Sequence, residues 1–140
     1  MFRKVLVAVL GAGTEDPALD AAGDLARRLG SELVLAGLVP TEDGPSTVED
    51  ALEAERREAA RDFLDRALRR MREQGVVPAA VEITGPPAES ILDYARQQDV
   101  DLVVLASGGG PATAPIHGDL AARLVAAARV PVLTVPRAAG

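Results

Sequence analysis

The sequence contains no cysteine and very few aromatic residues. Without cysteine the chain can form no disulfide, no thiolate nucleophile and no cysteine-ligated metal site, which suits a reducing compartment, and we expect the cytoplasm. Aromatic residues make up 2% of the chain, whereas hydrophobic residues as a whole make up 48%. The core must therefore be built from valine, leucine, isoleucine and alanine, as in helices packed tightly on a sheet.

An excess of positive charge is also missing. The formal net charge is -6 and the isoelectric point is about 4.8. Nucleic acids and anionic membranes bind clusters of lysine and arginine, so we expect neither as a partner. The sequence has no apolar run of ~18 residues and no leader in which a charged segment precedes an apolar one, so we expect neither a transmembrane helix nor a signal peptide.

Apolar runs of strand length alternate with helical patterns along the 140 residues. This length fits a single domain, residues 1–140. The alternation predicts right-handed crossovers and therefore an α/β fold, an open, doubly wound parallel sheet of five strands with four helices. The predicted strands cover residues 4–10, 32–39, 80–83, 101–106 and 132–135, and the predicted helices cover residues 17–29, residues 47–74, a segment from 87 and a segment from about 120.

The second of these helices is rich in charge. Arginines and acidic residues stand three or four positions apart, a pattern typical of a solvated helix surface rather than of a partner-binding one. We expect its buried stripe to consist of Leu52, Ala59, Phe63, Ala67 and Met71.

A strand, a glycine-rich loop and a helix follow one another over residues 101–119. The loop, residues 107–117, contains three consecutive glycines and two prolines. Flexible backbone ahead of a helix can turn its N–H groups toward a phosphate at the positive end of that helix. If the first and fourth strands are neighbours, this loop and the loop at residues 11–16 face each other across a cleft beyond the strand ends, where open sheets bind ligands.

Other nucleotide-binding and catalytic motifs are not found. The first loop has two glycines but lacks the third glycine of the dinucleotide fingerprint, and Asp16 would repel a pyrophosphate, so NAD is not expected. Lys4 is the only lysine, so the chain has no Walker sequence. The single histidine, His117, has no serine nucleophile or orienting carboxylate at a recognisable spacing, which favours a solvent-exposed side chain over a general base. No spacing predicts a metal site.

Four stretches match a known family in their order and spacing. They are Lys4-Val-Leu-Val-Ala-Val9, Asp101-Leu-Val-Val-Leu-Ala-Ser107, the glycine-rich loop that follows, and Ala128-Arg-Val-Pro-Val-Leu-Thr-Val135. Together they resemble the universal stress protein family over essentially the whole chain. The resemblance implies an adenine-nucleotide alpha hydrolase-like fold with sheet order 3-2-1-4-5. It also implies a homodimer made by pairing the last strands, Val132 to Val135. We favour this pairing over an edge shielded by the chain's own tail, because an uncovered apolar edge invites pairing.

Members of this family that bind ATP carry Gly, two residues, Gly, nine residues, Gly, and then Ser or Thr. In this chain Ala106 stands at the first Gly and Gly109 at the second, and Gly118 stands at the third after a spacer shortened by one residue. Asp119 replaces the hydroxyl residue, and its carboxylate would place like charge beside a phosphate at a cost of about 1–4 kcal/mol. Leu10 stands where binders have an Asp near the adenine and ribose, and an unpaired polar ligand group costs about 1–3 kcal/mol.

Some contacts of such a cleft would survive these changes. Ser107, Gly109 and Gly118 could still contact phosphates, and Leu38, at the end of the second strand, could contact the base. The candidate cleft consists of Ala8, Val9, Leu10, Leu38, Ala106, Ser107, Gly109, Gly118 and Asp119.

Three functions are compatible with this cleft. The first, which we favour, is a non-catalytic stress-response module that is dimeric and cytoplasmic and binds ATP weakly or not at all. The second is a nucleotide-dependent switch that binds ATP or AMP with Mg²⁺, as the glycine loop before a helix would allow. The third is a slow nucleotide hydrolase. For this third function the chain offers no positioned base, and Arg123, the one arginine near the loop, is expected to face solvent.

Overall fold

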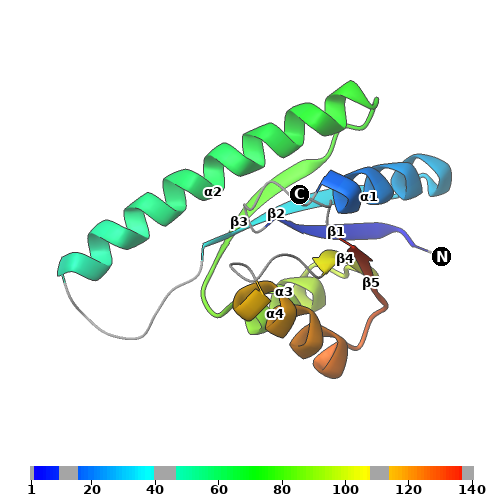
Figure 1. The fold of residues 1–140 in the computed structure, drawn as a ribbon. Helices are drawn as coiled ribbons and strands as arrows, with labels where there is room; N and C mark the ends of the chain where they lie inside the picture. The colour runs from blue at the N-terminus through cyan, green and yellow to red at the C-terminus, as the bar shows by residue number, and fades with distance from the viewer. Residues whose placement is uncertain (1, 10–15, 40–46, 108–113, 137–140) are drawn as a thin grey trace.

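The computed structural model describes residues 2–9, 16–39, 47–107 and 114–136, and for residues 47–53, 56, 107 and 114–119 it describes the backbone alone. Strands and helices alternate along the chain, as the sequence predicts (Figure 1). In chain order the elements are β1 (Lys4–Val9), α1 (Asp16–Leu29), β2 (Glu32–Val39), α2 (Thr47–Glu73), β3 (Ala79–Thr84), α3 (Pro87–Gln97), β4 (Leu102–Ser107), α4 (Ala114–Ala127) and β5 (Val132–Pro136).

The five strands form one sheet in the order β3-β2-β1-β4-β5, and every neighbouring pair is parallel. This confirms the predicted strand order and places β1 and β4 side by side at the centre. Val7 of β1 is opposite Leu35 of β2 on one side and opposite Val104 of β4 on the other. The direction of the crossovers reverses between β1 and β4, so the ends of these two strands form the switch point of the sheet.

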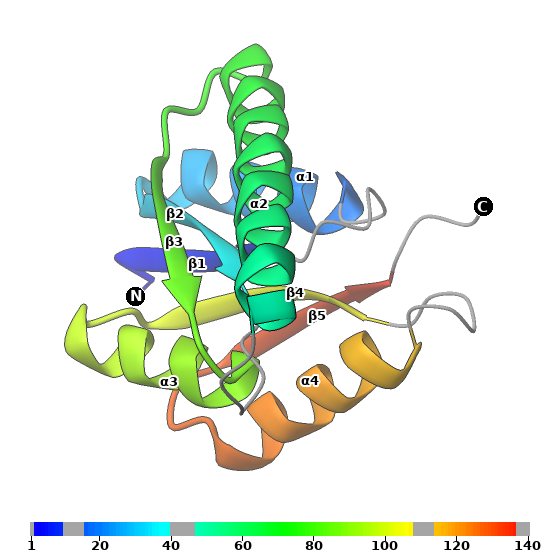
Figure 2. The same ribbon diagram turned by 90° about the vertical axis from the view of Figure 1, so that its left-hand side faces the viewer.

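Helices cover both faces of the sheet: α1 and α2 lie on one face, and α3 and α4 lie on the other (Figures 1 and 2). Successive side chains of β1 pack alternately into the apolar clusters on the two faces of the sheet. Val5 and Val7 belong to the apolar cluster under α1 and α2, whereas Leu6 and Ala8 belong to the cluster under α3 and α4. A strand covered on both faces needs apolar residues at successive positions, which explains the uninterrupted apolar run of β1.

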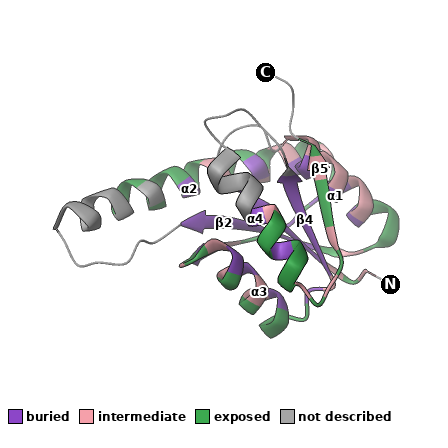
Figure 3. Cartoon of the chain, turned by 60° about the horizontal axis from the view of Figure 1, so that its bottom comes forward, coloured by how far each residue is buried: buried purple, intermediate pink, exposed green. Residues whose placement is uncertain are grey.

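Most of the buried surface lies on the central strands and on one face of each helix (Figure 3). α1 and α2 end within one residue of the predicted positions. Gly30 after α1 has a φ of 67° and Gly75 after α2 has a φ of 82°, backbone conformations that glycine adopts without steric cost. In the part of the chain that the structure describes, the helices are too short or too polar to span a lipid bilayer.

The buried stripe of α2 differs in part from the predicted one. Ala67 and Met71 are buried as expected, and Phe63 packs partly buried against the same cluster, but Ala59 is exposed. The side chain of Leu52 lies outside the described set. The stripe runs instead along Ala60, Leu64, Ala67 and Met71. With this spacing one face of α2 packs against β2. The two elements approach closely at Gly37, where a Cβ would lie 3.5 Å from the Leu64 side chain.

The last helix begins earlier than predicted. α4 starts at Ala114 rather than near Leu120, so His117, Gly118 and Asp119 belong to the helix and not to a loop or its edge. The sequence interpretation took Pro115 as a helix breaker. A proline in the first turn is tolerated, however, because the N–H that it lacks has no partner within the helix.

Candidate functional site

The switch point of the sheet places two strand ends next to each other. β1 and β4 pair in parallel, with Leu6 opposite Val103 and Val7 opposite Val104, and they end at Val9 and Ser107. This confirms that the first and fourth strands are neighbours, the condition on which the predicted cleft depends. The two loops that leave these ends, including Leu10 and Gly109, lie outside the described residues.

Four of the predicted cleft residues are buried within strands. Ala8 and Leu38 belong to the cluster under α3 and α4, whereas Val9 and Ala106 belong to the cluster under α1 and α2. Ala106 is only 1% exposed, so its methyl group packs in the core. The methyl group that Ala106 adds relative to glycine therefore packs in the core near the end of β4, rather than in the candidate cleft. Ser107 is the last residue of β4, and its backbone alone is described.

The remaining predicted residues lie on α4. Gly118 and Asp119 are the fifth and sixth residues of a helix that starts at Ala114. In an α-helix only the first four N–H groups lack a partner within the helix, and later ones bond to the carbonyl four residues back. The backbone N–H groups of Gly118 and Asp119 are therefore used inside α4.

A second feature near the end of β1 was not predicted from the sequence. A cavity of about 380 Å³ lies between α1 and α2, and α2 contributes three arginines to its lining. The sequence interpretation treated these arginines as a solvated helix surface. The complete lining is Val9, Asp16, Leu19, Phe63, Arg66, Ala67, Arg69, Arg70 and Glu73.

A hydrogen-bonded network holds α1 and α2 together beside this cavity. Arg70 donates from Nε and a terminal nitrogen to the two carboxylate oxygens of Asp20, at 2.9 and 2.8 Å, and Gln74 donates to Asp20 Oδ1 at 2.5 Å. A terminal nitrogen of Arg70 also lies 3.4 Å from Asp16. The hydrogen bonds from Arg70 lower the pKa of Asp20 against the opposing effect of its burial, and Gln74 adds to the lowering. Asp20 is therefore ionised at neutral pH.

Metal-ligating side chains do not converge on either feature. Across the described segments there is no group of three or more histidine, cysteine or acidic residues placed to hold a metal ion. Arg123 of α4 is exposed, as predicted.

Comparison with known proteins agrees with this architecture. The family model described as the Universal stress protein family matches residues 1–136. The chain belongs to the universal stress protein family. Universal stress protein YxiE of Bacillus subtilis (strain 168) is 31% identical to it over 123 residues, which cover 78% of this chain and 81% of YxiE.

Solved structures of this family share the fold. A universal stress protein family member from Burkholderia pseudomallei superposes with a TM-score of 0.77 at 34% identity, covering 96% of each chain. The universal stress protein of Archaeoglobus fulgidus in complex with dAMP superposes with a TM-score of 0.66 at 22% identity, covering 95% of this chain and 97% of that one. At that identity the second likeness shows a common fold and nothing further.

Proposed function

We propose that this universal stress protein is a non-catalytic binding or interaction module of the cytoplasm whose nucleotide cleft has diverged, so that ATP binds weakly or not at all. The observation that carries the proposal is the start of α4 at Ala114. The pattern of ATP-binding members requires a glycine and a hydroxyl residue at the phosphates. Here the matching residues, Gly118 and Asp119, have their N–H groups engaged within the helix.

The free N–H groups of α4 lie earlier in the chain. Among the described residues they belong to Ala114 and Ile116, because Pro115 has none. The positive end of the helix is thus displaced from the position that the family pattern assigns to the phosphates. Asp119 adds a like charge at the position of the missing hydroxyl, at a cost of about 1–4 kcal/mol near a phosphate. Both effects weaken a triphosphate most, since it carries the most charge.

Calorimetry with ATP and Mg²⁺ on the purified protein tests this proposal. We expect no saturable heat and no thermal stabilisation at millimolar ATP. The variant Asp119→Ser removes the like charge and should improve ATP binding by about tenfold or more, enough for a weak signal. Asp93→Ser, which removes an exposed acid from α3, is the matched control and should change nothing. Saturable binding of ATP to the natural protein below millimolar concentration would overturn the proposal.

A nucleotide-dependent switch is the second candidate function. It is favoured by the dAMP bound to the Archaeoglobus fulgidus relative, a ligand with one phosphate and hence less need of helix N–H groups. Mass spectrometry of denatured protein after purification distinguishes the two. An adenine mononucleotide recovered in proportion to the protein would favour the switch, with or without Mg²⁺. If no nucleotide is recovered and the purified protein does not bind AMP, the diverged cleft is the better explanation.

Catalysis by the same cleft is tested by phosphate release from ATP. Arg123 is exposed on α4 and is the nearest arginine to the glycine loop in the sequence. We expect no steady release of phosphate above background. Release that falls in Arg123→Ala or Gly118→Ala would establish a hydrolase instead.

The same proposal includes a homodimer formed through β5. β3 and β5 are the two edge strands of the sheet, and they differ in chemistry. β3 carries Glu82, which pairs with Arg61 at 3.2 Å, whereas β5, Val132–Pro136, has no charged residue and exposes 37% of Leu133. Charged side chains protect edge strands from pairing, so β5 is the better dimerisation edge.

Analytical ultracentrifugation of two matched variants tests the dimer. Leu133→Lys places a charge on the β5 edge and should convert the dimer to a monomer. Ala80→Lys, at an exposed position of β3, should leave the dimer intact. A natural protein that is monomeric at all concentrations, or a dimer lost only in Ala80→Lys, would show that β5 is not the interface.

A further inference from the structure

The cavity between α1 and α2 has an apolar floor and a charged rim. Its floor is formed by the side chains of Val9, Leu19, Phe63 and Ala67. Its rim comes from the first turn of α1 and the second half of α2, where Arg66, Arg69 and Arg70 stand beside the acids Asp16 and Glu73. A volume of about 380 Å³ lies within the range of small-molecule pockets. Such a lining suits a ligand with an apolar body and a charged end.

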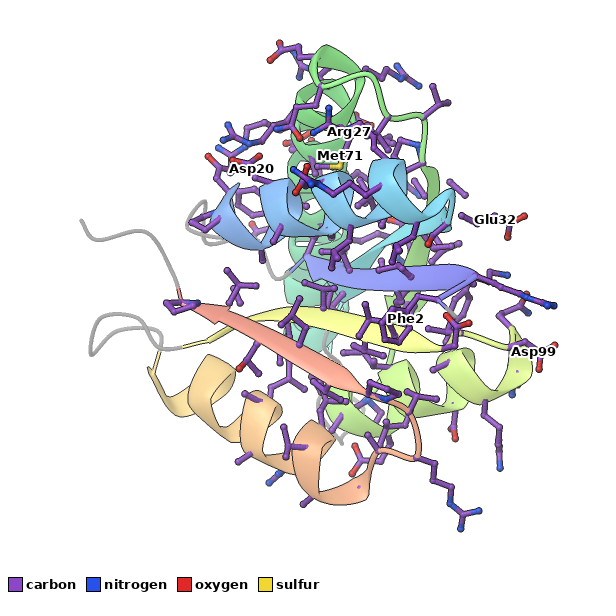
Figure 4. The ribbon with its side chains drawn as sticks, turned by 90° about the vertical axis from the view of Figure 1, so that its right-hand side faces the viewer. Phe2, Asp20, Arg27, Glu32, Met71 and Asp99 are labelled. Atoms are coloured by element: carbon purple, nitrogen blue, oxygen red, sulfur yellow. The ribbon has the colours of Figure 1, made fainter. Side chains whose placement is uncertain are left out.

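One of the three arginines is already engaged. Arg70 is held by both oxygens of Asp20 and lies 3.4 Å from Asp16, and Gln74 fixes Asp20 from the next turn. These hydrogen bonds direct the Asp20 side chain of α1, labelled in Figure 4, toward α2. This network makes Arg70 a fixed wall of the cavity. Most of its charge is compensated, so it is not the group that would recognise a ligand.

The other two arginines have no acidic partner among the described residues. Arg66 lies over the ring of Phe63, with its guanidinium carbon 5.5 Å from the ring centroid, and Arg69 forms no hydrogen bond or ion pair within the described segments. They stand three positions apart, so their side chains leave neighbouring points of one helix face. Both arginines line the same cavity, so their two positive charges lie close together.

The charge of the lining sets the charge of the ligand. The acids beside the cavity act on Arg70: Asp20 pairs with it, Asp16 lies 3.4 Å from it, and Glu73 interacts with its charge. The positive charges left for a ligand are therefore those of Arg66 and Arg69. A polyphosphate would meet repulsion from Asp16 and Glu73, whereas one carboxylate or sulfonate could lie between Arg66 and Arg69. We propose that the α1/α2 cavity binds a small organic monoanion, whose apolar body lies on Phe63 and the floor and whose charged group is held by Arg66 and Arg69.

This site is separate from the diverged nucleotide cleft. It shares Val9 with the candidate cleft residues and Asp16 with the first of the two loops that follow the strand ends. The rest of its lining comes from α1 and α2, whereas α4 lies on the opposite face of the sheet (Figure 2). The inference therefore does not depend on whether nucleotide binds.

A pair of fluorescent probes tests the proposal. The anionic probe is 8-anilinonaphthalene-1-sulfonate, and its neutral counterpart is N-phenyl-1-naphthylamine, which lacks the sulfonate. We expect saturable binding of the anionic probe to the folded protein. Arg69→Gln should weaken that binding by about tenfold, as loss of a hydrogen bond to a charged group does. The same variant should leave binding of the neutral probe unchanged.

Arg72→Gln is the matched control. Arg72 is exposed on the same helix and does not line the cavity, so the control removes the same charge without touching the site. It should bind the anionic probe as the natural protein does, and thermal melts should show both variants folded, since neither side chain is buried. Equal losses in Arg69→Gln and Arg72→Gln, displacement of the probe by ATP, or no saturable binding at all would each overturn the proposal.

Discussion

Replacing Asp101 with asparagine should loosen the start of the two central strands. Asp101 immediately precedes β4, and its carboxylate accepts hydrogen bonds from the backbone N–H groups of Arg3 at 2.8 Å and Lys4 at 3.0 Å. Its own N–H donates to the Lys4 carbonyl at 3.0 Å. One side chain thus joins the beginning of β1 to the beginning of β4, at the end of the sheet opposite the candidate cleft.

The expected loss follows from these two bonds. Asparagine keeps one carbonyl oxygen but turns an amide group toward the second N–H, so one charge-assisted bond is lost and the other is weakened. Bonds to charged groups contribute about 1.5–3 kcal/mol each when buried, and Asp101 is only partly buried. We therefore expect Asp101→Asn to lower the free energy of unfolding by about 1–3 kcal/mol near neutral pH.

The effect should depend on pH. Burial is the strongest influence and acts to raise the pKa of Asp101, but the N–H groups of Arg3 and Lys4, with its own N–H, together outweigh burial and leave the pKa below its usual value. A carboxyl whose pKa is lower in the folded state stabilises the fold fully above its unfolded pKa of about 3.9. That contribution is lost as pH falls through the folded pKa.

Urea unfolding at two pH values measures both predictions. Near pH 7 Asp101→Asn should be clearly less stable than the natural protein, and the difference should shrink in acid, as the pH falls through the lowered pKa of Asp101 and the natural carboxyl takes up a proton. Asp65→Asn, at an exposed position of α2, removes the same charge and should have little effect. If both variants lose equal stability, or if the loss in Asp101→Asn is unchanged in acid, the reasoning is wrong.

Three further substitutions test the packing by the same unfolding measurement. Gly85→Ala should cost about 1–3 kcal/mol, because Gly85 has a φ of 133° and a Cβ there would lie 2.7 Å from Ser90 Oγ; adding Ser90→Ala should relieve only the contact and leave the backbone strain. Gly37→Ala should change stability by less than about 1 kcal/mol, because its new methyl would make ordinary contacts at 3.5 Å. Met71→Ala should cost about 2–5 kcal/mol, because Met71 is fully buried, whereas Met71→Leu should cost less than about 1.5 kcal/mol.

The fold could be predicted from the sequence because its determinants are local. The apolar run of β1 shows a strand covered on both faces, and Gly30 and Gly75 end their helices at the expected places. Strand order came from the family resemblance, since periodicity carries no information on which strands are neighbours. The predicted start of α4 was wrong because a proline such as Pro115 breaks a helix in its interior but is favourable in its first turn.

The cavity between α1 and α2 could not be predicted in the same way. Its residues come from two helices that touch through tertiary packing, and the local sequence does not determine their alignment. The helices approach closely at Gly23, where a Cβ would lie 3.3 Å from Met71 Cε. This approach brings Asp20 to Arg70, whereas Arg66 and Arg69 form no ion pair with any residue that the structure describes. The only sequence signal was the spacing of Arg66, Arg69 and Arg70 after Phe63, which is also common on solvated helices.

Membership of the family is stronger evidence for the fold than for a bound ligand, because different residues determine the fold and the ligand affinity. The sheet is held by alternate side chains of β1 and its neighbours, which pack on both helix layers. Affinity for a phosphate depends instead on free N–H groups and on charge just beyond the strand ends. Asp119→Ser changes the charge but leaves the N–H group of residue 119 inside α4, so it should restore part of the affinity at most. If that one substitution restored tight ATP binding, the start of the helix would not be the barrier, and the carboxylate alone would explain the divergence.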